Sequence, residues 1–171
     1  MILSTLCYIE NDGRYLMLHR TKKEQDPNQG KWIGVGGKFE EDESPDECVI
    51  REVKEETGFS LTDCRFRGIV TFVSDQWETE YMHLFTAHGF IAPDGSAIPD
   101  ASIRCEAELP ACAEGQLKWV DKAEVPSLPT WEGDRIFLKL LMETDEFFSL
   151  KLEYRGEELI RATAGGKEIE S

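Results

Sequence analysis

Short apolar runs separated by polar turns recur along most of the chain, and this pattern predicts β-strands. Asn11-Asp12-Gly13 joins the first two runs and Arg155-Gly156 joins the last two, so we expect a hairpin at each end of the chain. The predicted strands are 2–10, 15–20, 61–66, 68–73, 81–91, 117–120, 147–154 and 157–162.

The clearest helix signal covers residues 45–57. Ser44 precedes it, Pro45 lies in its first turn, and Glu47 follows Ser44 by three positions, which makes a capping box with proline at a favoured place. Gly58 can adopt the left-handed conformation that ends a helix. Both ends of this helix are therefore predicted from local residues.

Two arcs of this helix differ in character. At about 100° per residue, the apolar side chains share one arc, which must face the core. They are Val49, Ile50, Val53 and Thr57. The neighbouring arc carries Glu52, Glu55 and Glu56, which repel one another. This arc is either a solvated acidic face or an oxygen cage for a hard divalent cation such as Mg²⁺, and the spacing alone leaves both interpretations open.

A glycine-rich segment precedes the helix. Gly34, Gly36 and Gly37 surround Val35 shortly after Lys31-Trp32. We expect a backbone in conformations closed to other residues, approaching the acidic arc closely enough to place a carbonyl on a metal ion.

A second helix is expected from Thr130, as its N-cap, through Met142, after a helical turn at 121–128. Its apolar face would contain Ile136, Phe137, Leu140 and Leu141. Two long helices flanking a strand-rich middle predict an α/β/α sandwich with a mixed sheet and peripheral hairpins. We expect one domain over 1–163, a long loop at 92–113 and a frayed tail at 164–171.

Charge and cysteine content narrow the function. A net charge of −15 and a pI near 4.6 argue against binding to a nucleic-acid duplex, and a polyanionic small substrate would need bound cations. Five cysteines without a CxxC spacing favour neither disulfides nor zinc, which suits the cytoplasm. The apolar N-terminal run is too short for a membrane span. The sequence does not indicate an oligomeric state.

One segment resembles the Nudix box. Gly37 is followed after five residues by Glu43, and after seven more by REVKEETGF, which begins at Arg51. The resemblance implies hydrolysis of a nucleoside diphosphate linked to another group. The GKWxGxGGK approach and the Trp131-Glu132-Gly133-Asp134 stretch are similar to MutT-type oxidised purine nucleoside triphosphate diphosphatases.

The resemblance implies a role for each matching residue. Glu52 would be the general base or a ligand of the metal and its water, and Glu55 and Glu56 would be metal ligands. The carbonyl of Gly37 and the downstream Glu114 would complete the metal site for Mg²⁺, or for Mn²⁺. Arg51 would orient the carboxylates by a bidentate bond.

The substrate contacts follow in the same way. Lys23, which is near the glycine segment in sequence, is a candidate for a substrate contact, and Lys38 is a candidate for a phosphate contact. Each is otherwise a solvated charge. Trp131 would stack on the purine, or is an ordinary core aromatic, and Asp134 would bond the base edge. Mammalian members carry an Asn where this chain has Ile33, and paired acids where it has Asp134 alone.

The implied reaction is attack by a metal-activated water on a nucleoside triphosphate such as 8-oxo-dGTP, releasing the monophosphate and pyrophosphate. The rivals within the family are hydrolysis of ADP-ribose, of dinucleoside polyphosphates or of RNA 5′ ends. The non-catalytic alternative is a nucleotide-binding sensor that keeps the fold but does not hydrolyse its ligand.

Overall fold

The computed structural model describes residues 1–169 and contains a ten-stranded sheet and two α-helices. The strands are β1 (Ile2–Asn11), β2 (Arg14–Arg20), β3 (Trp32–Ile33), β4 (Ser60–Ser74), β5 (Glu80–Ile91), β6 (Ala97–Ile98), β7 (Gly115–Asp121), β8 (Phe148–Arg155), β9 (Glu158–Ala164) and β10 (Lys167–Ile169). The helices are α1 (Pro45–Thr57) and α2 (Asp134–Glu143), with a 3₁₀ turn η1 (Val125–Ser127) between β7 and α2.

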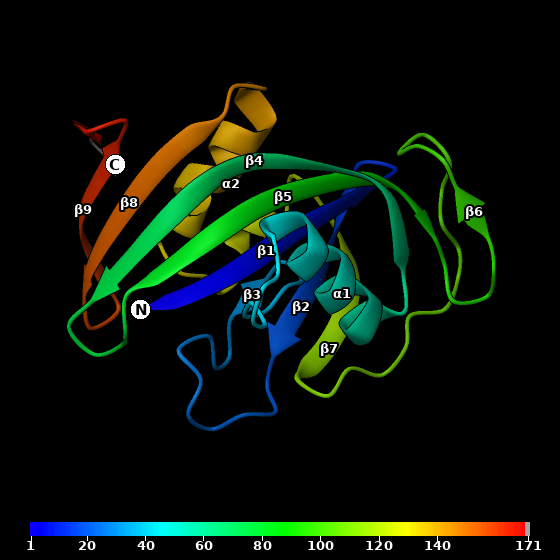
Figure 1. The fold of residues 1–171 in the computed structure, drawn as a ribbon, viewed down its shortest axis with the longest axis horizontal. Helices are drawn as coiled ribbons and strands as arrows, with labels where there is room; N and C mark the ends of the chain where they lie inside the picture. Colours follow the sequence, from blue (N-terminus) through cyan, green and yellow to red (C-terminus); the bar gives the residue numbers. More distant parts are fainter. Residues whose placement is uncertain (170–171) are drawn as a thin grey trace.

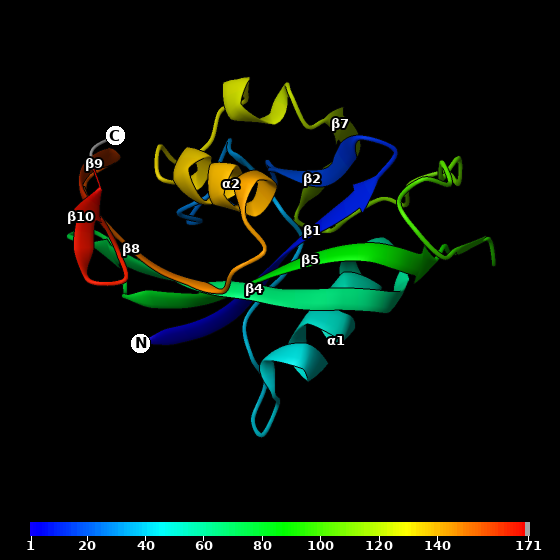
Figure 2. The same cartoon turned by 90° about the horizontal axis from the view of Figure 1, so that it is seen from above.

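The sheet is mixed. Hydrogen-bonded neighbours follow the order β10-β9-β8-β4-β5-β1-β2-β3, with β7 beside β2 and β6 beside β5. β1 is parallel to β5 and β4 is parallel to β8, whereas the other pairs are antiparallel. β4, β5 and β1 lie side by side (Figure 1), and Figure 2 shows α1 and α2 on opposite sides of the β4 and β5 layer. The α/β/α sandwich predicted from the sequence is confirmed.

Helix α1 has the predicted bounds because its local signals are all used. Ser44 Oγ accepts a hydrogen bond from the backbone N–H of Glu47 at 3.1 Å. Gly58 has φ 74°, and its N–H donates to the Lys54 carbonyl at 2.9 Å. One expectation for its apolar arc is wrong: Ile50 is 45% exposed, and Cys48 is buried in its place. The buried arc is therefore turned slightly from the predicted one, toward β1 and β4.

The start of α2 differs from the prediction. Residues 131–133 form a turn, and the helix begins at Asp134 after Gly133, which supplies no side-chain cap. Within residues 1–169, Thr130 Oγ1 finds no hydrogen-bond partner, so it does not cap the helix. The hydroxyl of Tyr154 accepts from the Gly133 N–H at 2.7 Å. A contact from β8 thus replaces the local cap that the sequence predicted.

Two peripheral segments also differ from expectation. Residues 167–169 were expected in a frayed tail, yet they form β10, which pairs with β9 through Lys167 and Ala164. The expected tail residues 170 and 171 lie outside the described part. The predicted gap between strands 61–66 and 68–73 is a register irregularity inside the single strand β4. In residues 1–169 no helix is long and apolar enough to cross a membrane.

Candidate active site

A cavity of about 660 Å³ is bordered by β1, β4, β5, α1, the segment 34–38 and the residues at the start of α2. It brings together most site residues predicted from the sequence. They are Lys23, Gly37, Lys38, Arg51, Glu52, Glu56, Glu114, Trp131 and Asp134. Glu55 does not border the cavity. Its side chain is 58% exposed and is held by Arg51 Nη1 at 3.3 Å.

The glycines of segment 34–38 are required by space rather than by an unusual backbone conformation. A Cβ on Gly36 would lie 2.0 Å from the Thr5 carbonyl oxygen, and one on Gly37 would lie 2.4 Å from the Glu52 carboxyl carbon. Neither residue has positive φ, so the expected closed conformation is wrong, whereas the expected close approach is present. Gly37 lets Glu52 lie against the backbone.

The carbonyl of Gly37 faces the sheet. It accepts from the Thr5 N–H at 2.8 Å, and Cys48 Sγ lies 3.7 Å away. These contacts fix the position of segment 34–38 between β1 and α1. Thr5 Oγ1 is a further donor to this carbonyl, at 3.5 Å. A role for the carbonyl as a metal ligand stays a prediction.

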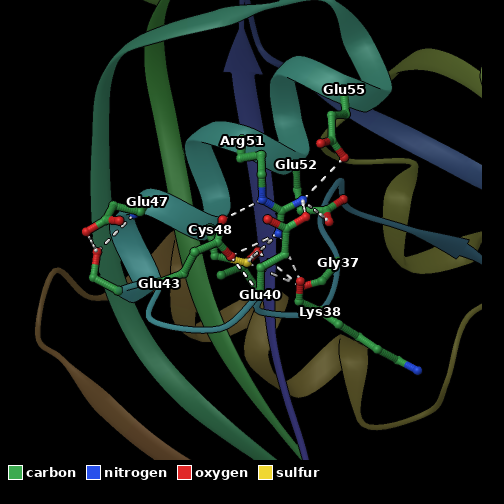
Figure 3. A network of polar contacts seen from close by, with 11 residues as sticks. Gly37, Lys38, Glu40, Glu43, Glu47, Cys48, Arg51, Glu52 and Glu55 are labelled. Atoms are coloured by element: carbon green, nitrogen blue, oxygen red, sulfur yellow. Dashed lines mark hydrogen bonds and ion pairs between the residues drawn. The ribbon is translucent and has the colours of Figure 1, made fainter.

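Arg51 is the centre of a charged network on α1 (Figure 3). Its Nε donates to Glu43 Oε1 at 2.5 Å and its Nη2 donates to Glu43 Oε2 at 3.0 Å, a bidentate pair. Its Nη1 donates to Glu52 Oε1 at 2.7 Å. The guanidinium lowers the pKa of Glu43 to about 2. The expected bidentate bond of Arg51 thus goes to Glu43, and Glu52 receives a single bond. A catalytic role for Arg51 stays a prediction.

Glu56 is the most buried carboxylate at this end of the cavity. Burial, followed by the charges of Glu114 and Glu52, raises its pKa to about 8. Its Oε2 is buried without a hydrogen-bond partner in the described residues. Burial also raises the pKa of Glu52, although Arg51 opposes that shift. These groups are costly to ionise unless a cation joins them.

Glu114 immediately precedes β7 and borders the cavity. Arg20 Nη1 contacts its Oε2 at 2.5 Å, and Lys23 Nζ contacts its Oε1 at 2.9 Å. Arg20 was not predicted from the sequence, because its position next to Glu114 depends on the pairing of β2 with β7, which aligns Arg20 with Gly115. Lys38 extends away from the carboxylate network in Figure 3.

The residues at this end fit a divalent cation. As they stand, no three acidic, cysteine or histidine side chains within 1–169 are gathered into a ligand cluster, and Arg51 and Arg20 hold Glu52 and Glu114 instead. The unpartnered Glu56 Oε2 is nevertheless the kind of orphaned acceptor that a cation satisfies. Carboxylate oxygens are the ligands that Mg²⁺ prefers.

The opposite end of the cavity is aromatic. Trp131 is only 5% exposed, and its Nε1 donates to Asn28 Oδ1 at 2.9 Å. Lys31 Nζ lies 4.5 Å from its ring centroid and does not border the cavity, so Lys31 covers the far face of the ring. Trp131 thus packs in the core, as one of the two interpretations expected, and it also borders the cavity; stacking on a purine stays a prediction.

Asp134 borders the same end and is 6% exposed. Burial raises its pKa to about 8, with Arg135 and Lys31 opposing the shift. The group is held in the protonated form at neutral pH, so it can both donate and accept a hydrogen bond. The Trp131 and Asp134 pair predicted from the sequence is present at one end of one cavity.

Comparisons with known proteins identify the family. A family profile described as NUDIX domain matches residues 2–141. The uncharacterized Nudix hydrolase YvcI of Bacillus subtilis strain 168 is 34% identical over 144 residues, which are 81% of this chain and 78% of that protein. An oxidized purine nucleoside triphosphate hydrolase of Danio rerio is 26% identical over 160 residues, covering 92% and 90% of the two chains.

A solved structure gives the same result for the fold. A MutT protein from Bacillus halodurans superposes with a TM-score of 0.78 at 25% identity, over 98% of this chain and 99% of that chain. The family profile covers most of the residues that build the sheet, α1 and α2, and the likeness to the MutT structure extends over nearly the whole length. This protein is therefore a member of the Nudix hydrolase family, with a fold of the MutT type.

Proposed function

We propose that this Nudix hydrolase converts oxidised purine nucleoside triphosphates such as 8-oxo-dGTP to the monophosphate and pyrophosphate, with Mg²⁺ as the metal. One observation carries the proposal: a single cavity joins a carboxylate end on α1 to an aromatic end with a buried acid. The full-length likeness to an oxidized purine nucleoside triphosphate hydrolase supports the same substrate class.

The carboxylate end would act on the triphosphate. When bound, Mg²⁺ supplies Lewis acidity and offsets the charge of the phosphate oxygens. Glu56 and Glu114 would hold it together with Glu52, with Glu55 turning inward from α1. Mn²⁺ accepts the same oxygen ligands and would replace it. Pairing with a cation also removes the cost of burying ionised Glu56.

Glu52 would accept the proton of the attacking water. Burial raises its pKa, which moves the group toward the range where a general base works well at neutral pH. Arg51 keeps its carboxylate in one orientation through the 2.7 Å bond. Lys23 and Lys38 border the cavity and would contact the phosphates. Their positive charges would attract an anionic substrate to a protein whose net charge is −15.

The aromatic end would bind the base. The near face of Trp131 would stack on the purine, since its other face is covered by Lys31. Asp134 would bond the base edge with a group that both donates and accepts. A polar group buried in this way rejects bases that leave it unpaired.

A panel of substrates with Mg²⁺ tests the proposal. It contains 8-oxo-dGTP, dGTP, ADP-ribose, diadenosine tetraphosphate and a 5′-triphosphate RNA, with products separated by chromatography. We expect monophosphate and pyrophosphate from the purine triphosphates, with 8-oxo-dGTP hydrolysed most efficiently. The Glu52→Gln variant, purified in parallel, controls for contaminating phosphatases. Turnover confined to ADP-ribose, the dinucleotide or RNA would overturn the proposed substrate, and binding without release would identify a sensor.

A further inference from the structure

Strands β1, β4 and β5 form one wall of the cavity, and a single charged group lies on this part of the sheet. The residues of β1, β4 and β5 that border the cavity are Ile2, Ser4, Thr5, Leu6, Phe72, Glu80 and Met82. Glu80 is the one ionisable side chain among them. A carboxyl group on a wall whose other side chains are apolar or hydroxyl-bearing is expensive to bury, so its presence needs a reason.

Strand register places Glu80 at the aromatic end. Glu80 is directly opposite Phe72 in the antiparallel β4 and β5 pair, so both side chains lie on the same face of the sheet. The Phe72 ring packs edge-on against Trp131, with centroids 5.2 Å apart. Glu80 therefore lies beside Phe72, which itself packs against Trp131, the ring that would stack on the base.

The Glu80 carboxyl group makes no hydrogen bond or ion pair in the part of the chain that the structure describes. Ser4 Oγ, on the neighbouring strand β1, is buried and likewise finds no partner within residues 1–169. Burial raises the pKa of Glu80, and the Ser4 hydroxyl opposes this from nearby without completing a hydrogen bond. A buried hydroxyl without a partner beside a carboxyl group, with both facing the cavity, indicates that a bound ligand supplies hydrogen bonds to them.

We propose that Glu80 is a specificity residue that contacts the base, accepting hydrogen bonds from adjacent N–H donors on the edge of a guanine-type purine, with the Ser4 hydroxyl beside it. An ionised carboxylate presents two acceptor oxygens, which match two neighbouring N–H donors. An adenine-type edge offers one donor next to one acceptor and leaves one oxygen of Glu80 unpaired. This inference rests on the proposed nucleotide substrate, and it adds a third base-contacting residue to Trp131 and Asp134.

Glu80→Gln is the informative substitution because it keeps the shape and exchanges one acceptor for a donor. Glu78→Gln is the matched control. Glu78 also borders the cavity and carries the same charge, but its side chain is 59% exposed and bonds the N-terminal ammonium at 2.8 Å. It reports the effect of removing one negative charge near the cavity without removing a base contact.

Two readouts separate this inference from the proposed function. The first is the dissociation constants of GMP and AMP without metal, measured by calorimetry, and the second is kcat/KM for dGTP and dATP with Mg²⁺. We expect Glu80→Gln to shift the guanine to adenine preference toward adenine by about tenfold or more in both, since one buried hydrogen bond is lost and another is gained. Glu78→Gln should leave the preference unchanged.

The inference is overturned if Glu80→Gln leaves the preference within about twofold of the wild-type value, if it weakens both bases equally, or if Glu78→Gln shifts the preference as much. It is also overturned if the wild type binds neither monophosphate. If the wild type hydrolyses no triphosphate, the proposed function is wrong, and the metal-free binding ratio still decides the role of Glu80.

Discussion

The two ends of the cavity are built in opposite ways. At the carboxylate end, Glu43, Arg51, Glu52 and Glu56 come from one helix and the turn before it. Arg51 joins Glu43 and Glu52 by charge-assisted bonds, whereas Glu56 is held by burial. At the aromatic end, Phe72, Glu80, Trp131 and Asp134 come from three separate elements and meet through packing. We infer that the first end is specialised for chemistry common to the family, and the second for the choice of substrate.

The largest effect is expected at the carboxylate end. Glu52→Gln should lower kcat by about 10²- to 10⁴-fold, because a positioned general base contributes on that order. The variant should fold, since Arg51 keeps its bidentate bond to Glu43. Steady-state kinetics and a thermal melt check both points. Turnover near the wild-type level in a folded variant would remove Glu52 from the chemistry.

The second prediction concerns the metal. Mg²⁺ at about 100 times its Kd should stabilise the wild type by about 2.7 kcal/mol, because it binds the folded state alone. Glu55→Gln with Glu56→Gln should abolish most of the accompanying rise in Tm. Metal-free stability should change little, because Glu56 with a pKa of about 8 is already neutral at pH 7.

The control for the metal experiment is Glu143→Gln with Glu146→Gln, which makes the same two side-chain exchanges at two exposed positions that do not border the cavity. This control should keep the full Mg²⁺ response. An equal Mg²⁺ response in the wild type and the Glu55 and Glu56 double variant would place the metal elsewhere.

The third prediction moves to the aromatic end. Trp131→Ala should raise KM for all purine triphosphates by a similar factor, because base stacking contributes about 1–3 kcal/mol and tolerates any base. Trp131 is also buried, so this variant should lose about 3–5 kcal/mol of stability. Trp131→Phe keeps an aromatic face and should retain most of the substrate affinity and most of the stability. A change in KM for one purine alone would show that Trp131 discriminates between bases.

The fourth prediction is a dependence of stability on pH. The pKa of Asp134 is about 8 in the folded protein and near 3.8 in the unfolded chain, so between these values the folded state binds the extra proton. The free energy of unfolding therefore falls as pH rises from about 4 to about 8 and then levels. Asp134→Asn lacks this contribution.

Urea unfolding of the wild type and Asp134→Asn without metal, at several pH values from 5 to 9, measures the difference between them. The stability advantage of the wild type should shrink as pH rises, while shared contributions such as Glu56 cancel in the difference. A difference that is constant or grows with pH would show that Asp134 is not held protonated.

The two ends also differ in how far the sequence predicts them. α1 was predicted to the residue because Ser44, Glu47 and Gly58 act within a few positions of its ends. α2 was placed too early because Tyr154, on β8, binds the Gly133 N–H and no local residue signals this contact. Spacing on one helix likewise revealed the acidic arc with Glu52, Glu55 and Glu56.

Site residues whose positions depend on strand register could not be predicted from the sequence. Arg20 meets Glu114 only because β2 pairs with β7. Glu80 comes to the cavity through its alignment with Phe72, and its sequence neighbourhood carries no signal for such a role. The close approach of Gly36 and Gly37 was predicted, but its cause is the space beside Thr5 and Glu52, which the chain alone does not show.

The most direct test of the account is the ratio of kcat/KM for 8-oxo-dGTP and dGTP in the wild type, Asp134→Asn and Asp134→Ala. The account predicts that the wild type prefers 8-oxo-dGTP and that both substitutions selectively erode this preference, because the buried acid reads the base edge while the carboxylate end is untouched. A proportional loss of both activities with the ratio unchanged would contradict it, and would make Asp134 a structural residue of α2.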